Sequence, residues 1–92
     1  MQSLLEAPVH LTRPTRHAYA AAVLLRVVTA RGWCAEAAAR DLRARLHDDR
    51  ALLRLLQARV SRAMLVRPTA TDARAHATLE LALAGVPAER RR

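Results

Sequence analysis

Apolar residues recur along the chain at the three- and four-residue spacing of a helix, and no stretch alternates with the period of two that a strand shows. Proline and glycine divide this pattern, because Pro14 suits a first helical turn and Gly32 and Gly85 suit the left-handed position after a helix. The resulting segments are about 14–31, 34–66 and 72–84. The pattern therefore predicts an all-α fold, a small helical bundle of three to four helices.

The middle segment carries a heptad-like seam, in which apolar residues follow one another at alternating spacings of four and three. Its apolar members are Ala35, Ala39, Leu42, Leu46, Leu53, Leu56, Val60 and Ala63. Asp49 is the one polar residue in this register, and the segment holds neither Gly nor Pro. We therefore expect one continuous or mildly kinked helix over 34–66. The alternative is two helices broken at 47–49, with Asp48 as the N-cap of the second.

The first segment is apolar on most of its circumference, with Arg16, Arg26 and Thr29 as its clearly polar positions. A helix of this kind is buried on several sides. We therefore expect more apolar helix surface than 92 residues cover alone, and completion of the bundle by a homodimer, the commonest symmetric assembly. The residues expected at an interface with a second copy or another helical protein are Leu24, Leu53, Leu56 and Val60.

The ends of the segments give a single-domain organisation. We expect residues 1–13 to form a weakly ordered N-terminal arm, 14–85 a single helical domain and 86–92 a charged tail. Thr71 is the predicted N-cap of the last helix. Cys34, the only cysteine, cannot form an internal disulfide and is expected to be a small buried residue.

The chain is strongly basic, with 16 arginines against 8 acidic residues and a formal net charge of +8. Lys, Ile, Phe and Asn are absent, and their shared AT-rich codons indicate a GC-rich gene, so the choice of Arg over Lys is not itself a sign of phosphate recognition. An arginine-rich face is nevertheless predicted as a candidate nucleic-acid surface, the alternative being a solvated face. Its residues are Arg50, Arg54, Gln57 and Arg62, with Arg90, Arg91 and Arg92 in the tail.

The remaining patterns exclude several classes of function. The longest apolar run, 18–28, is interrupted by Arg26 and is shorter than the roughly 20 residues of a membrane span. No signal peptide is recognisable, and with a single cysteine we expect a cytoplasmic protein. Metal-ligand spacing, paired carboxylates and a glycine-rich phosphate loop are also missing, so we expect no metal, no cofactor and no catalytic residue.

Residues 42–59, Leu-Arg-Ala-Arg-Leu-His-Asp-Asp-Arg-Ala-Leu-Leu-Arg-Leu-Leu-Gln-Ala-Arg, resemble the first long helix of all-α chorismate mutases. The resemblance implies a small helical dimer whose arginines hold a dicarboxylate substrate. It needs a one-residue gap before Asp49, and here only one short helix follows where that family has long ones. No catalytic residue is carried over from it.

These observations predict a non-enzymatic helical protein-interaction module, a dimeric bacterial regulator or adaptor. The alternative is a DNA-binding regulatory protein that uses the arginine-rich face. A mutase-like small helical enzyme is the third hypothesis.

Overall fold

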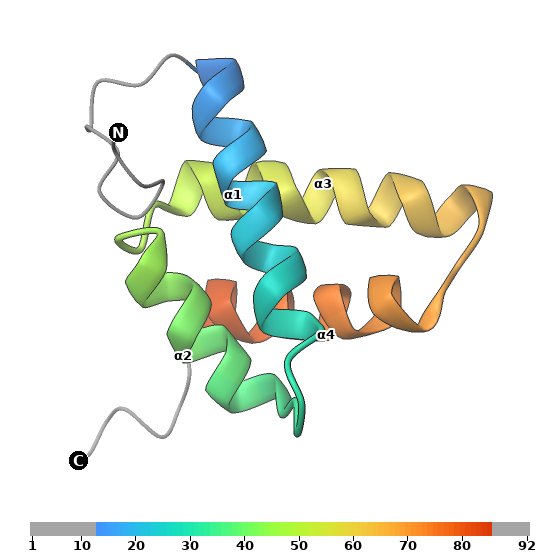
Figure 1. Ribbon diagram of the computed structural model, residues 1–92. Helices are drawn as coiled ribbons and strands as arrows, with labels where there is room; N and C mark the ends of the chain where they lie inside the picture. Colours follow the sequence, from blue (N-terminus) through green and yellow to red (C-terminus); the bar gives the residue numbers. More distant parts are fainter. Residues whose placement is uncertain (1–12, 86–92) are drawn as a thin grey trace, which may run out of the picture.

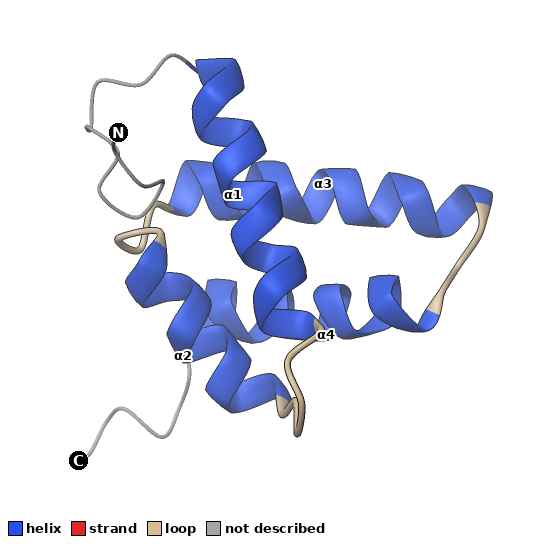
Figure 2. Ribbon diagram, viewed as in Figure 1, coloured by secondary structure: helices blue, strands red, loops and turns tan. Residues whose placement is uncertain are grey.

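The computed structural model describes residues 13–85, which form four helices and no strand (Figures 1 and 2). The helices are α1 (Arg13–Val28), α2 (Ala35–Arg45), α3 (Arg50–Val66) and α4 (Ala70–Ala84). The predicted all-α bundle is confirmed. The predicted arm, apart from Arg13, and the predicted tail lie outside the described residues. None of the helices within 13–85 is long and apolar enough to cross a membrane.

Helix α4 is the central element of the bundle, because it packs against each of the other three helices and its contacts with α2 and α3 are the most extensive in the fold. Figure 1 shows α3 and α4 side by side and running in opposite directions, with α1 crossing them. Four residues of α4, Ala75, Thr78, Leu79 and Ala82, are buried. Small alanine side chains at two of these positions let neighbouring helices approach closely.

The core is built from leucine, valine and alanine, as expected for a chain without phenylalanine. Its most deeply buried large side chains are Leu42, Leu53, Leu56 and Leu79, which come from α2, α3 and α4. The residues predicted to form an interface, Leu24, Leu53, Leu56 and Val60, all belong to this core and are at most 9% exposed within the single chain. They are therefore core residues of one protomer rather than an accessible surface.

The prediction of a continuous helix over 34–66 is wrong, because the chain turns between Arg45 and Arg50. Helix α2 ends in a Schellman motif, in which the Asp48 N–H donates to the Arg43 carbonyl at 2.7 Å and the His47 N–H to the Ala44 carbonyl at 3.2 Å. His47 and Asp48 both adopt left-handed backbone angles, with φ of 55° and 54°. His and Asp enter this region more readily than most residues, so the motif forms here without glycine.

The cap of α3 is Asp49, one residue later than the predicted Asp48. Its carboxylate accepts a hydrogen bond from the Leu52 N–H at 3.2 Å and an ion pair from Arg16 at 2.7 Å. The turn therefore also ties α1 to the start of α3. It splits residues 42–59 between α2 and α3, so they do not form the single long helix on which the resemblance to chorismate mutases depends.

Two other helix ends differ from their predicted positions. Helix α1 ends at Val28, so Gly32, with φ of 72°, lies within the following turn rather than directly after the helix. Helix α4 begins at Ala70, and its N-cap is Thr69, whose hydroxyl accepts from the Asp72 N–H at 3.1 Å. Thr71, the predicted cap, lies inside the first turn and is exposed. Both threonines have the hydroxyl that a cap needs, and only the backbone path after Pro68 distinguishes them.

Candidate functional site

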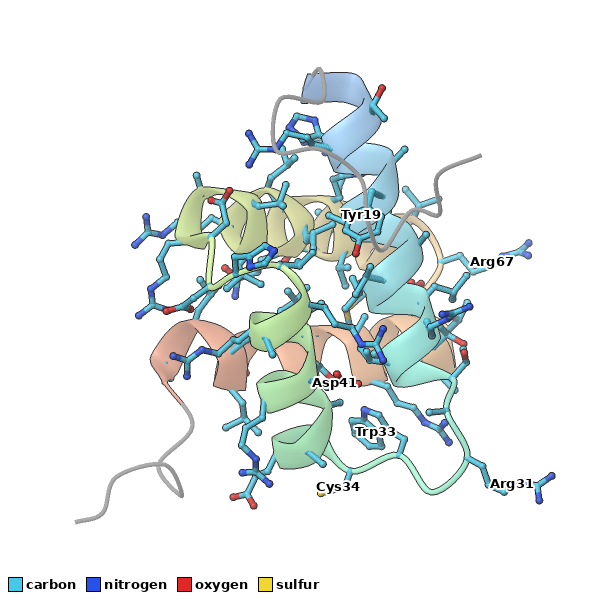
Figure 3. All side chains as sticks on the ribbon, turned by 60° about the vertical axis from the view of Figure 1, so that its left-hand side comes forward. Tyr19, Arg31, Trp33, Cys34, Asp41 and Arg67 are labelled. Atoms are coloured by element: carbon cyan, nitrogen blue, oxygen red, sulfur yellow. The ribbon has the colours of Figure 1, made fainter. Side chains whose placement is uncertain are left out.

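The arginines of α3 are the main concentration of unpaired charge among the described residues. Helix α3 holds Arg50, Arg54, Arg59 and Arg62 and no acidic residue, and Arg67 follows directly. Arg54, Arg59, Arg62 and Arg67 are exposed and make no hydrogen bond or ion pair within residues 13–85. Figure 3 shows Arg67 extending away from the body of the protein. This part of the molecule therefore presents a positive surface.

Arg50 belongs to the predicted arginine-rich face but has a different role. Its Nη1 donates to the carbonyl oxygens of Ala82 at 3.2 Å and Leu83 at 2.8 Å. These carbonyls belong to the last turn of α4, which lacks intrahelical donors and carries the negative end of the helix dipole. Arg50 thus caps the C-terminus of α4, and its Nη1 is hydrogen-bonded within the protein.

The other residues of the predicted arginine-rich face differ in how exposed their side chains are. Gln57 is half-buried and lines a shallow depression against α4, together with Ala77 and Leu81. Arg54 and Arg62 are exposed. Two of the four predicted α3 residues, Arg54 and Arg62, are thus both exposed and unpaired within residues 13–85, whereas Arg50 is exposed but hydrogen-bonded. Arg90, Arg91 and Arg92 lie outside the described residues.

The end of α3 exposes large apolar side chains. Beyond Val60 no residue of α3 is buried: Met64 is half-buried, whereas Leu65 is 87% and Val66 is 84% exposed. Figure 1 shows this end of α3 reaching the connection to α4 at the edge of the molecule. We call this surface the α3 tip and define it as Arg62, Met64, Leu65, Val66 and Arg67.

Sequence reasoning missed the α3 tip, although a signal was present. Leu65 and Val66 do not fall on the heptad-like seam that continues through Val60 and Ala63. Leu65 and Val66 lie off the buried side of α3, and Pro68 ends the helix two residues after Val66. No further helical turn follows to pack against their side chains. That combination marks an apolar surface at a helix end.

Acidic residues gather elsewhere, on α2 and the turn after it. Asp41 pairs with Arg45 at 2.8 Å, and Asp48 pairs with Arg43 at 3.1 Å. Within residues 13–85, the other acidic side chains are Glu36, Asp49, Asp72 and Glu80. None lies between Arg50 and Thr71. Helix α3 therefore contains no carboxylate of its own, although Asp49 caps its start and Asp72 lies in the first turn of α4.

The two aromatic residues, Trp33 and Tyr19, pack against the core, and Cys34 is exposed. Trp33 packs against the core, its indole N–H donates to the Thr78 hydroxyl at 3.1 Å, and the Arg74 guanidinium lies 5.4 Å from its ring centroid. Tyr19 is half-buried against the core. Cys34 is exposed beside Trp33 at the start of α2, so the prediction that it is buried is wrong (Figure 3).

Within the described residues, no group of three or more His, Cys, Asp or Glu side chains gathers in a way that could hold a metal ion. Comparisons with protein-family models, with curated proteins and with solved structures find no match to this chain. The candidate site is therefore the α3 tip, an exposed apolar helix end flanked by Arg62 and Arg67, which are unpaired within residues 13–85.

Proposed function

We propose that this protein is a non-enzymatic helical interaction module that binds an acidic, amphipathic helix of another protein at the α3 tip. The observation that carries the proposal is the exposure of Leu65 and Val66, next to each other on a helix end, while the large apolar side chains of the described core are covered. Contiguous apolar surface of this kind is a common feature of interaction sites. An amphipathic helix would cover it with its apolar side.

The charge around the tip supports an acidic partner. Arg59, Arg62 and Arg67 are exposed and unpaired within residues 13–85, and no carboxylate of α3 offsets them. Acidic residues at the rim of a partner helix would be attracted to them and would set its orientation. A second copy docked tip to tip would bring the same arginines together, which is unfavourable. The apolar faces that predicted a homodimer are also largely buried within one chain.

A duplex nucleic acid is the competing partner for the same arginines. Arg54 and Arg62 would contact its phosphates. Leu65 and Val66 do not favour this partner, because a phosphate backbone offers little apolar surface to cover them. The two partners therefore differ in which side chains they require, and the experiment below uses that difference.

The test is fluorescence anisotropy with the full chain and three labelled probes: an amphipathic helical peptide with a glutamate rim, the same apolar face with a lysine rim, and a mixed-sequence DNA duplex. We expect the glutamate peptide to bind at least about tenfold more tightly than the lysine peptide. The L65S/V66S double variant should weaken that binding by about tenfold or more, as expected for truncation of central apolar contacts. The matched control is Leu25→Ser, which removes another exposed leucine on α1 and should leave binding unchanged.

Three results would overturn the proposal. One is equal binding of the two peptides, or binding that L65S/V66S does not change. Another is tight duplex binding that falls steeply with salt and survives L65S/V66S, which would assign the arginines to nucleic acid. The third is a stable dimer in light scattering that L65S/V66S dissociates, which would make a second copy the occupant of the tip.

A further inference from the structure

A buried arginine nitrogen on α2 lacks a protein acceptor. Nη1 of Arg40 is inaccessible to solvent and makes no hydrogen bond, and it is the one such side-chain atom among the described residues. A guanidinium is always charged and can only donate. Leaving a buried donor of this kind unpaired is costly, particularly when it carries charge. A group that accepts hydrogen bonds and carries negative charge is the natural partner for it.

Arg40 lines a shallow, widely open cleft on one face of α2 and the turn that follows. The other lining residues are Arg43, Ala44, His47 and Asp48. Arg40, Arg43 and Ala44 share a face of α2 because they are spaced by three and four residues. The left-handed backbone at His47 and Asp48 places both residues on the same cleft.

The charges around this cleft leave one cation without a counterpart. Arg43 pairs with Asp48 through Nε to Oδ1 at 3.1 Å and Nη2 to Oδ2 at 3.4 Å. This forked pair holds both side chains at the wall of the cleft and neutralises one positive charge against the one carboxylate. Arg40 remains as the uncompensated charge, and the His47 ring adds a further polar group.

We propose that this cleft binds a small oxyanion, a phosphate or a carboxylate, with Arg40 as its principal ligand. A guanidinium donates charge-assisted hydrogen bonds to the oxygens of either group, and a bound ion would have to draw the buried Nη1 of Arg40 toward the cleft. The site lies on α2 and its turn and shares no residue with the α3 tip, so it does not depend on the proposed function.

The experiment is isothermal titration calorimetry of the full chain with inorganic phosphate and, separately, with acetate, at ionic strength held constant with chloride. We expect saturable binding at one site, weakened by about tenfold in Arg40→Gln because a charge-assisted contact is lost. Arg45→Gln is the matched control: it lies on the same helix, is paired with Asp41 and does not line the cleft, so it should leave binding unchanged. Binding of phosphate alone identifies a phosphate site, and binding of both identifies a general oxyanion site.

A second measurement protects the test against a folding defect. Far-ultraviolet circular dichroism and thermal unfolding of Arg40→Gln should show a native fold of equal or higher stability, because the variant removes an unpaired buried charge. His47→Ala should also weaken binding without loss of helix. Heat signals that do not saturate, or equal affinities of Arg40→Gln and the native protein, would overturn the proposal. If Arg40→Gln unfolds, the test rests on His47→Ala and Arg45→Gln. Phosphate binding that His47→Ala leaves unchanged, or that Arg45→Gln weakens as much as His47→Ala does, would then overturn the proposal.

Discussion

At the scale of single residues, identical side chains on one helix have different roles. Arg50 and Arg54 are one turn apart on α3, yet Arg50 donates to two carbonyls at the end of α4 and Arg54 is exposed and unpaired within residues 13–85. Their spacing on α3 is that of a common face. What separates them is the position of Ala82 and Leu83, more than 30 residues further along the chain.

This difference predicts the outcome of two alanine substitutions. Arg50→Ala should lower the free energy of unfolding by about 1–2 kcal/mol, because hydrogen bonds from a charged donor are lost at a partly exposed site. Arg54→Ala should change it by less than about 0.5 kcal/mol, as is usual for exposed positions. Urea denaturation of the two variants measures both values. Equal losses would mean that Arg50 does not stabilise the end of α4.

The contact between Trp33 and Thr78 gives a second residue-scale prediction. Thr78 is fully buried, and its hydroxyl accepts the indole N–H at 3.1 Å. Thr78→Val keeps the shape of the side chain and removes the acceptor, so we expect a loss of about 1 kcal/mol. A double-mutant cycle with Trp33→Phe should give a coupling energy of about 0.5–1.5 kcal/mol. A coupling energy of zero would show that the bond contributes nothing to stability.

At the scale of helices, the caps and the turns decide where each element begins and ends. The spacing of the seam continues through 45–50 with Asp49 as its one polar member, and Leu42, Leu46, Leu53 and Leu56 are all buried as the seam predicts. The helix itself stops, because Asp49 caps α3 and His47 and Asp48 accept left-handed backbone angles. The pattern of side chains was therefore a reliable guide to burial and an unreliable one to continuity of the backbone.

The N-terminus of α4 offers a direct comparison of two threonines. Thr69→Ala removes the hydroxyl that accepts the Asp72 N–H, and we expect a loss of about 1 kcal/mol in stability. Thr71→Ala should be close to neutral or slightly stabilising, because alanine has the higher helix propensity. Thermal unfolding of both variants distinguishes them. The reverse order would place the cap at Thr71 and the start of α4 two residues later.

At the scale of the whole molecule, α4 holds the bundle together and the α3 tip stands outside the core. Helices α1, α2 and α3 each pack against α4. The four apolar residues that we first expected at a partner interface complete this single core. Apart from Leu25 on α1, the exposed large apolar side chains of the described residues are Leu65 and Val66 at the end of α3.

A pair of leucine substitutions tests this division. Leu79→Ala should lower the free energy of unfolding by about 2–5 kcal/mol, because it opens a cavity in the core beside α4, against which α1, α2 and α3 pack. Leu65→Ala should change it by less than about 0.5 kcal/mol, because its side chain is 87% exposed. Chemical denaturation monitored by Trp33 fluorescence provides the measurement. A large loss in Leu65→Ala would mean that the tip is covered in solution.

The sequence by itself determined the helical class, the approximate positions of the helical segments other than the break at 46–49, the aliphatic composition of the core and the buried side of residues 39–60. Those properties depend on local periodicity and on amino-acid composition. Only the tertiary structure decided that α4 is central and that Arg50 caps the end of α4 while Arg54 is unpaired within residues 13–85. It also decided that a buried nitrogen of Arg40 lacks an acceptor and that Leu65 and Val66 are exposed. Each of those outcomes depends on which distant segment packs against a residue, and the spacing of residues along one helix does not contain that information.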